Sequence, residues 1–278
     1  MKTILIPTDF SSGADNAARF AFQLMRDEAC HFILLHCYHV PATTPDISIS
    51  ISEVLKTEAE KKLEEEWEKL QYGLDLPPGS TVERVSEYGS AVMVIEQLTE
   101  SREIDLVVMG TTGASGFKEA LIGSNTSAAM NHVKCPLLAV PEQAKFESFD
   151  KVVFATDFKE LNSEAGLDFF KAIAKKHQSA VTILHVQPRE KLLSLESSLE
   201  GMMLHNYLEE VEHVYDFKEG DDPVGTIHQY VSEQKAGLLA VIAHDYGLFK
   251  ALFHKSITKK LVHHTKVPML VLHDYKEE

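Results

Sequence analysis

The chain has 278 residues, with 27 lysines and arginines against 42 aspartates and glutamates, so its formal net charge is −15. At about 150 residues per domain, this length predicts two domains. Hydrophobic residues make up 44% of the chain and charged residues 25%, which is typical of a globular protein and excludes wholesale disorder. The acidic balance argues against binding to nucleic acid or to an anionic membrane, because phosphate contacts need clustered lysine and arginine.

The sequence also argues against membrane insertion and against a disulfide framework. No apolar run reaches the roughly 18 residues that span a bilayer, and Thr8 and Asp9 interrupt the N-terminal segment before the apolar core of a signal peptide can form. The three cysteines, Cys30, Cys37 and Cys135, include no C-x-x-C pair. We therefore expect a cytoplasmic protein, with Cys37 a buried structural thiol and not a redox sensor.

In the first half of the chain, short apolar runs alternate with amphipathic segments. Near-continuous apolar runs are typical of strands that are covered on both faces in a parallel sheet. An apolar stripe over 14–25 predicts a helix capped by Ser11 or Ser12. Further helices are expected over 52–71 and 124–132. The predicted strands are 3–7, 32–37, 82–87, 106–110 and 137–140.

The second half repeats the first. Three motifs recur in the same order: Thr-Asp-Phe at 8–10 and 156–158, Leu-His at 35–36 and 184–185, and Lys-x-Pro at 134–136 and 266–268. Three ordered matches predict a duplicated domain, with one copy over 1–143 and the other over 149–278. The alternation of strands and helices predicts an α/β fold of two tandem doubly wound parallel sheets, with about five strands each and ligands at the carboxyl ends of the strands.

A cluster of glycines follows the fourth strand of the first copy and leads into a helix. It consists of Gly110, Gly113, Gly116 and Gly123. Glycine lets backbone N–H groups approach a phosphate, and the helix N-terminus at Ser124 adds further N–H donors. We also expect the hydroxyls of Ser124 and Thr126 to act as donors. The alternative is a glycine-rich surface loop, since the cluster matches neither the Walker nor the Rossmann fingerprint.

The spacing Gly110-x2-Gly113-x9-Gly123-Ser124 resembles the ATP-binding signature of universal stress proteins. Segments 7–9, 35–36 and 132–140 match that family as well. The resemblance covers both copies, as in tandem members of the family. It implies a five-stranded, Rossmann-like sheet of the adenine nucleotide alpha hydrolase type in each copy, with ATP in the first copy and Mg²⁺ between its phosphates.

The resemblance also implies which residues contact the nucleotide. Pro7, Thr8 and Asp9 would border the adenosine, and Cys37 would contact adenine through its backbone. The ribose and phosphates would be wrapped by Met109, Gly110, Thr111, Thr112, Gly113, Ala114, Ser115 and Gly116, and the phosphate tail would be bound by Gly123, Ser124 and Asn125. No residue is assigned as catalytic or as a metal ligand.

The second copy departs from this pattern. Lys255 stands in the place of Gly123, and Ala243 with Asp245 or Tyr246 replaces the first two glycines. These side chains would project where the phosphates lie, and Asp245 would repel them. We expect that the second copy has lost ATP binding; the alternative is a different anion held by Lys255. This copy is also rich in histidine, but no H-E-x-x-H arrangement occurs, so no metal is assigned.

The functional prediction is a regulatory universal stress protein with a role in the stress response. Nucleotide occupancy of the first domain would be read by an unidentified protein partner, and the second domain would act as an internal pseudo-dimeric partner, with a further homodimer left open. The alternatives are a slow ATPase or nucleotide-dependent transferase, and a nucleotide-independent scaffold or metal-binding protein. Because residues 110–116 include no lysine, arginine or obvious base, we expect ATP to be cleaved slowly, if at all.

Overall fold

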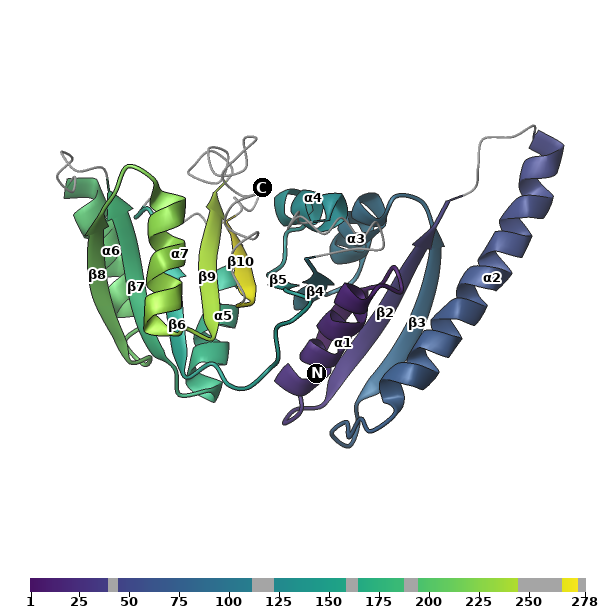
Figure 1. Cartoon of the computed structure of the whole chain (residues 1–278), viewed down its shortest axis with the longest axis horizontal. Coiled ribbons are helices and arrows are strands. Elements are labelled where there is room, and N and C mark those ends of the chain that lie inside the picture. Colours follow the sequence, from purple (N-terminus) through teal and green to yellow (C-terminus); the bar gives the residue numbers. More distant parts are fainter. Residues whose placement is uncertain (40–44, 112–122, 159–164, 188–194, 245–266, 275–278) are drawn as a thin grey trace. The chain divides into compact units, whose positions relative to one another are not determined.

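The computed structural model describes residues 1–39, 45–111, 123–158, 165–187, 195–244 and 267–274 (Figure 1). The described residues form two compact units that divide between Phe146 and Glu147; we call them unit 1 and unit 2. None of the described helices is both long and apolar enough to span a bilayer.

Unit 1 is a five-stranded sheet in the order β3-β2-β1-β4-β5, and the described strand pairs within it are parallel (Figure 1). Helices α1 and α2 contact each other, and so do α3 and α4. With right-handed crossovers, the first pair covers one face of the sheet and the second pair covers the other. In chain order the elements are β1 (Lys2–Pro7), α1 (Ser12–Leu24), β2 (Cys30–Tyr38), α2 (Pro45–Gln71), β3 (Thr81–Tyr88), α3 (Ala91–Ser101), β4 (Leu106–Gly110), α4 (Ser124–His132) and β5 (Leu137–Val140).

Unit 2 repeats this topology, with strand order β10-β9-β6-β7-β8 and parallel pairing among its described strands. The prediction of two tandem doubly wound parallel sheets with five strands each is therefore confirmed. The elements described in this unit are β6 (Lys151–Ala155), α5 (Ala165–Lys176), β7 (Ala180–Gln187), α6 (Leu195–Tyr207), β8 (His213–Glu219), α7 (Pro223–Gln234), β9 (Leu238–His244) and β10 (Met269–Asp274).

The local sequence accounts for the starts of two helices of unit 1, α1 and α2. Ser11 is the cap of α1, because its Oγ accepts a hydrogen bond from the Ala14 N–H at 3.3 Å. Helix α4 spans the residues expected for it. Helix α2 begins at Pro45, earlier than the expected residue 52. The isoleucines between residues 45 and 51 are spaced by two residues, which is not a helical period, so periodicity did not indicate a helix there. Proline, however, is well suited to the first position of a helix.

Candidate functional site

A pocket of about 410 Å³ opens in unit 1 at the carboxyl ends of β1, β2 and β4. The connection from β1 runs to β2 on one side, while β4 pairs with β1 on the other side. The pocket therefore lies where the strand order reverses, which is the usual ligand position in open α/β sheets. Nine of the residues expected at a nucleotide site line it: Pro7, Thr8, Asp9, Cys37, Met109, Gly110, Gly123, Ser124 and Asn125.

Among the described residues, Thr111 is the one expected site residue that does not line the pocket. Thr111 is buried, and its backbone lies between two elements: its N–H donates to the Val140 carbonyl at 3.0 Å, and its carbonyl accepts from the Gly123 N–H at 2.7 Å. The second of these bonds holds the start of α4 beside the end of β4. Five further residues lie outside the described part of the chain: Thr112, Gly113, Ala114, Ser115 and Gly116.

Thr126 lines the pocket, but its hydroxyl donates within the protein and not to a ligand, so the expectation of a free donor there is wrong. Its Oγ1 donates to the Gly110 carbonyl at 2.7 Å, and the residue is 4% exposed. This bond fixes the first turn of α4 against β4. Ser124 and Asn125 remain exposed at the helix start. Gly123, the N-cap residue, has no side chain to cap the helix, so N–H groups of the first turn are available to an anionic ligand.

Glycine is required at position 110 by close packing. A Cβ placed there would lie 2.6 Å from the carbonyl oxygen of Gly13 and 2.7 Å from its carbonyl carbon. These are backbone atoms of α1, and they have no freedom to swing aside as a side-chain tip would. The end of β4 and the first turn of α1 thus approach each other closely, and each contributes a residue, Gly110 and Ala14, to the pocket lining.

His36 fastens the ends of β1 and β2 to each other. Its Nδ1 donates to the Thr8 carbonyl at 2.9 Å, and the Phe10 ring packs on the imidazole with a centroid distance of 4.2 Å. Phe10 has a φ of 64°, in the left-handed region. Burial lowers the pKa of His36, while the hydrogen bond to Thr8 acts in the opposite direction. The neutral ring therefore presents Nε2 as an acceptor.

The same arrangement occurs in unit 2. His185 Nδ1 donates to the Thr156 carbonyl at 2.9 Å, and the ring of Phe158, with a φ of 51°, packs on the imidazole at 4.9 Å. Because both copies contain it, whether or not they carry the glycine cluster, we interpret the histidine contact as a structural element of the repeat. It shapes the strand ends from which the pocket of unit 1 is built.

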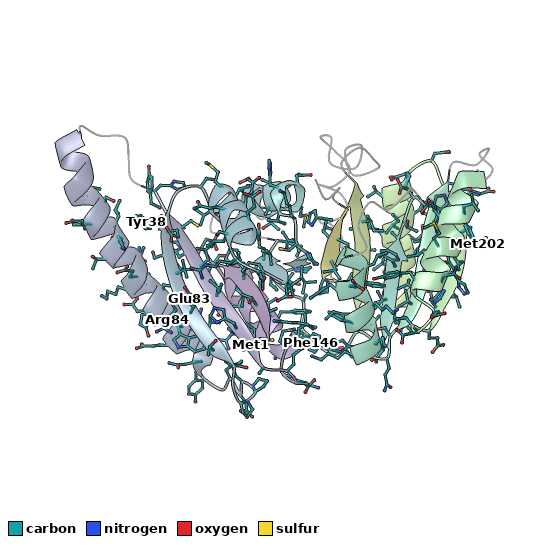
Figure 2. All side chains as sticks on the ribbon, turned by 180° about the vertical axis from the view of Figure 1, so that it is seen from behind. Met1, Tyr38, Glu83, Arg84, Phe146 and Met202 are labelled. Carbon is teal, nitrogen blue, oxygen red and sulfur yellow. The ribbon has the colours of Figure 1, made fainter. Side chains whose placement is uncertain are left out.

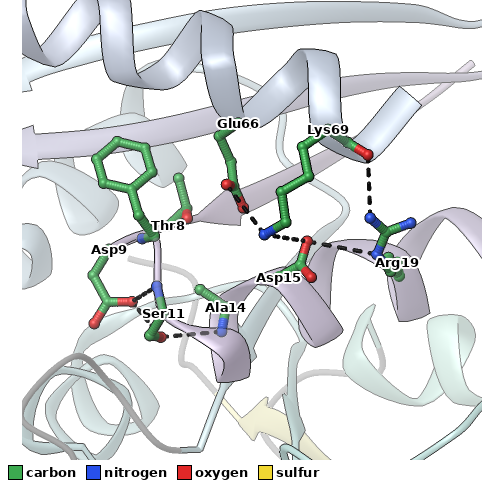
Figure 3. Close-up of polar contacts among 9 residues, drawn as sticks. Thr8, Asp9, Ser11, Ala14, Asp15, Arg19, Glu66 and Lys69 are labelled. Carbon is green, nitrogen blue, oxygen red and sulfur yellow. Dashed lines mark hydrogen bonds and ion pairs between the residues drawn. The ribbon is translucent and has the colours of Figure 1, made fainter. Parts of the chain in front are cut away.

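Asp9 is an exposed residue of the pocket lining, and Ser11 at the start of α1 orients its carboxylate (Figure 3). Its Oδ1 accepts hydrogen bonds from the Ser11 N–H at 3.1 Å and from the Ser11 hydroxyl at 2.5 Å. The same serine caps α1 through Ala14, which lines the pocket. The position of the carboxylate and the position of the helix start therefore depend on each other.

A set of charged residues ties the first turn of α1 to α2 (Figure 3). Asp15 Oδ1 lies 3.4 Å from Lys69 Nζ and 3.5 Å from Arg19 Nε, and Lys69 Nζ lies 3.6 Å from Glu66 Oε2. Glu66 is 7% exposed, and its burial raises the pKa of its carboxyl while the Lys69 ammonium opposes the shift. The two acidic and two basic side chains balance in charge. Their ion pairs anchor α1, which forms part of the pocket wall, to α2, the longest helix described in unit 1.

The cysteine side chains of unit 1 are thiols. Burial raises the pKa of Cys37 to about 12, with the Glu87 carboxylate adding to the effect, and burial raises the pKa of Cys135 to about 12 as well. None of the three cysteines forms a disulfide. Because the thiolate is the reactive form, Cys37 in the pocket is poorly suited to redox sensing.

Cys37 is therefore expected to react slowly with iodoacetamide at pH 8. At that pH, a pKa near 12 leaves far less thiolate than an ordinary cysteine has. We expect alkylation at least about tenfold slower in the native chain than in urea, measured by mass spectrometry of the peptide that contains Cys37. Equal rates in the two states would contradict the buried, protonated thiol.

The pocket also contains residues that the sequence did not indicate. His39 lines it from the end of β2, and Ser90 and Ala91 line it from the start of α3. The glycine cluster and the strand endings contain no signal for Ser90 or Ala91. These two residues reach the pocket because β3 pairs with β2, which is a contact between distant parts of the sequence.

Strand register corrects the expected alignment of the second copy. Gly110 pairs with Val140 in unit 1, and the equivalent pair in unit 2 is Ile242 with Leu272. Ile242, and not Ala243, therefore stands at the position of Gly110, so a branched side chain replaces the glycine. The other expected substitutions, at Asp245, Tyr246 and Lys255, lie outside the described residues.

The loop that follows β8 in unit 2 differs in charge from the loop that follows β3 in unit 1. The Gly89 N–H donates to the carbonyl of Tyr38, the last residue of β2, at 3.0 Å, and the Gly220 N–H donates to the carbonyl of Gln187, the last residue of β7, at 2.9 Å. The two glycines are therefore equivalent in the repeat. Ser90 follows the first glycine and lines the pocket, whereas two aspartates follow the second, at positions 221 and 222. Carboxylates at this place disfavour a polyphosphate.

These features define a Rossmann-like α/β protein with a pocket at the carboxyl edge of its first sheet. The sequence model of the universal stress protein family matches residues 1–141 and again residues 148–273. The chain therefore belongs to the universal stress protein family and is a tandem member of it.

Individual relatives agree with this assignment. A universal stress protein of Methanocaldococcus jannaschii is 28% identical over 157 residues, which cover 52% of this chain and 84% of that protein. A universal stress protein of Synechocystis is 29% identical over 157 residues, covering 49% of this chain and 96% of that protein. The crystal structure of a universal stress protein from Archaeoglobus fulgidus aligns with a TM-score of 0.74 over 98% of both chains at 22% identity, which supports the fold alone.

Proposed function

We propose that the chain is a cytoplasmic regulatory protein that binds ATP in unit 1 and not in unit 2. The observation that carries this proposal is the pocket of unit 1, where the uncapped start of α4 faces a cavity at the switch point of a doubly wound sheet. In this proposal the functional domains are 1–143 and 149–278, and the second serves as a pseudo-dimeric partner of the first.

The residues of the pocket suit an adenine nucleotide. Its volume of about 410 Å³ falls within the usual range for small-molecule sites. Pro7, Leu35 and Met109 supply apolar wall for a base and sugar, while Ser124 and Asn125 stand at the helix start, where phosphates bind. No group of three His, Cys, Asp or Glu residues among the described ones could hold a metal, so Mg²⁺ would be held by phosphate oxygens and water.

The pocket is better suited to holding ATP than to cleaving it. Among the described residues that line it there is no lysine or arginine, and phosphoryl transfer needs cationic groups and a positioned water. A bound nucleotide regulates by favouring the conformation that it binds more tightly, and a protein partner would recognise that conformation. A slow ATPase or nucleotide-dependent transferase is the alternative, consistent with the same cavity.

Titration of the purified chain with ATP should give one binding site per chain and negligible phosphate release over hours. The nucleotide carried through purification is extracted with acid and identified by chromatography, and binding is measured by calorimetry. Phosphate release at about 1 s⁻¹, within the ordinary range for enzymes, would favour the enzyme alternative. A stripped chain that binds no adenine nucleotide would contradict the proposal, and two sites per chain would contradict the assignment of unit 2.

A further inference from the structure

Two histidines of unit 2 face each other across the contact between α6 and β8. His205 Nδ1 lies 2.8 Å from His213 Nε2, and the ring centroids are 4.8 Å apart. His205 is exposed on the helix, and His213 is partly buried on the strand. The pair lies outside the pocket of unit 1, so any role of these histidines is independent of nucleotide binding there.

The pair is positioned by the packing of the helix on the strand. The Tyr215 hydroxyl donates to the Gly201 carbonyl at 2.9 Å, which fixes α6 over β8. His205 lies one helical turn after Gly201, and His213 lies two residues before Tyr215 on the same face of the strand. The first contact therefore brings the two imidazoles together without any ligand.

Hydrogen bonding defines the state of the inner ring. His213 Nδ1 lies 2.8 Å from the Val211 carbonyl. A carbonyl oxygen only accepts, so Nδ1 carries the proton and Nε2 directs a lone pair toward His205. A histidine whose second nitrogen donates to a backbone carbonyl has the arrangement that is typical of a metal ligand.

In unit 1 the helix that corresponds to α6 is α2, and it is held against β3 without a histidine pair. Register makes Val82 the equivalent of His213 and Arg84 the equivalent of Tyr215. Arg84, beside α2 (Figure 2), binds Glu64 of that helix, with Nε and Oε2 2.7 Å apart. The contact between helix and strand therefore does not require a histidine pair in this repeat. The pair in unit 2 is thus free to serve another role.

We propose that His205 and His213 chelate a transition-metal ion with the chemistry of Zn²⁺. Two nitrogens bound to tetrahedral zinc at about 2.0–2.1 Å lie roughly 3.3 Å apart, so the present 2.8 Å contact needs only a small opening, and His205 must carry its proton on Nε2. Because the described residues contain no group of three His, Cys, Asp or Glu residues that could hold a metal, water completes the coordination of the ion and the ion exchanges readily. When bound, the ion holds α6 against β8.

The test is a zinc titration of the full-length chain, stripped with a chelator beforehand, in competition with a chromophoric chelator. His205→Ala and His213→Ala are each expected to weaken binding at least about tenfold, since even outer-shell changes at metal sites cost about 10- to 100-fold. His132→Ala is the matched control: it removes one of the 14 histidines of the chain, an exposed one in unit 1, and should leave the affinity unchanged.

A second measurement separates chelation from incidental binding at the surface. Zinc should slow amide hydrogen exchange in residues 199–207 of the parent chain but not in His213→Gln, which keeps a polar side chain at the strand. Thermal denaturation without metal verifies that each variant is folded. Equal zinc affinity in the parent and both alanine variants would overturn the proposal, and so would zinc binding without slower exchange in this segment.

Discussion

Replacing Gly123 by aspartate is expected to weaken ATP binding by at least about 30-fold while leaving the fold intact. Gly123 is the N-cap of α4, with φ −50° and ψ 137°, a conformation open to any L-residue. Aspartate is among the best N-cap residues, so the helix should be at least as stable as before. A carboxylate about 4 Å from a phosphate costs about 2–4 kcal/mol at an effective dielectric constant of 20 or somewhat above, and each 1.4 kcal/mol is a factor of ten.

Gly123→Asn is the matched control for this experiment. Asparagine has nearly the same size as aspartate and caps helices as well, but it carries no charge, so it should bind ATP much more tightly than the aspartate variant. Calorimetric titration gives the affinities, and thermal denaturation verifies the fold. Equal losses in both variants would point to crowding and not to charge. Parent-like affinity in the aspartate variant would show that phosphate does not bind at the start of α4.

Replacing Gly110 by alanine is expected to lower the free energy of unfolding of unit 1 by about 1–3 kcal/mol, the usual cost of overpacking. The new Cβ would lie 2.6 Å from the Gly13 carbonyl oxygen. Relief requires a shift of α1 away from β4, which also moves Ala14 in the pocket wall. Urea unfolding followed by the fluorescence of Trp67 reports on this unit, because the only tryptophan of the chain lies in α2 beside Phe22.

Gly201→Ala adds the same methyl group with the opposite expected result. Its Cβ would meet the Phe158 ring at 3.6 Å, an ordinary contact, and alanine in a helix is favoured over glycine by about 0.5–1 kcal/mol. Calorimetry should therefore find unit 2 slightly stabilised. If Gly110→Ala unfolds at the same urea concentration as the parent chain, the close approach of α1 and β4 is wrong.

Much of the architecture could be predicted because its signals are local. Apolar runs over 106–110 and 137–140 became strands with those bounds, and the Ser124–His132 helix was found to the residue. The repeated Thr-Asp-Phe motif indicated the duplication, and in both copies it adopts the same contact with a histidine. Ligands of such sheets bind at the carboxyl ends of the strands, so the place of the pocket could be expected from the strand order. The nine pocket residues themselves were named from the resemblance to universal stress proteins.

The chain's residue order by itself determined the fold class, the duplication and the place of the pocket, since periodicity and strand endings are properties of neighbouring residues. Only the tertiary structure decided that the Thr126 hydroxyl turns inward to Gly110, that Ile242 occupies the equivalent of a glycine, and that His205 meets His213. Each of these depends on the register or packing of elements that fold together across long stretches of chain. A shift of one residue in a strand reverses the face that a side chain occupies, and no local pattern specifies that choice.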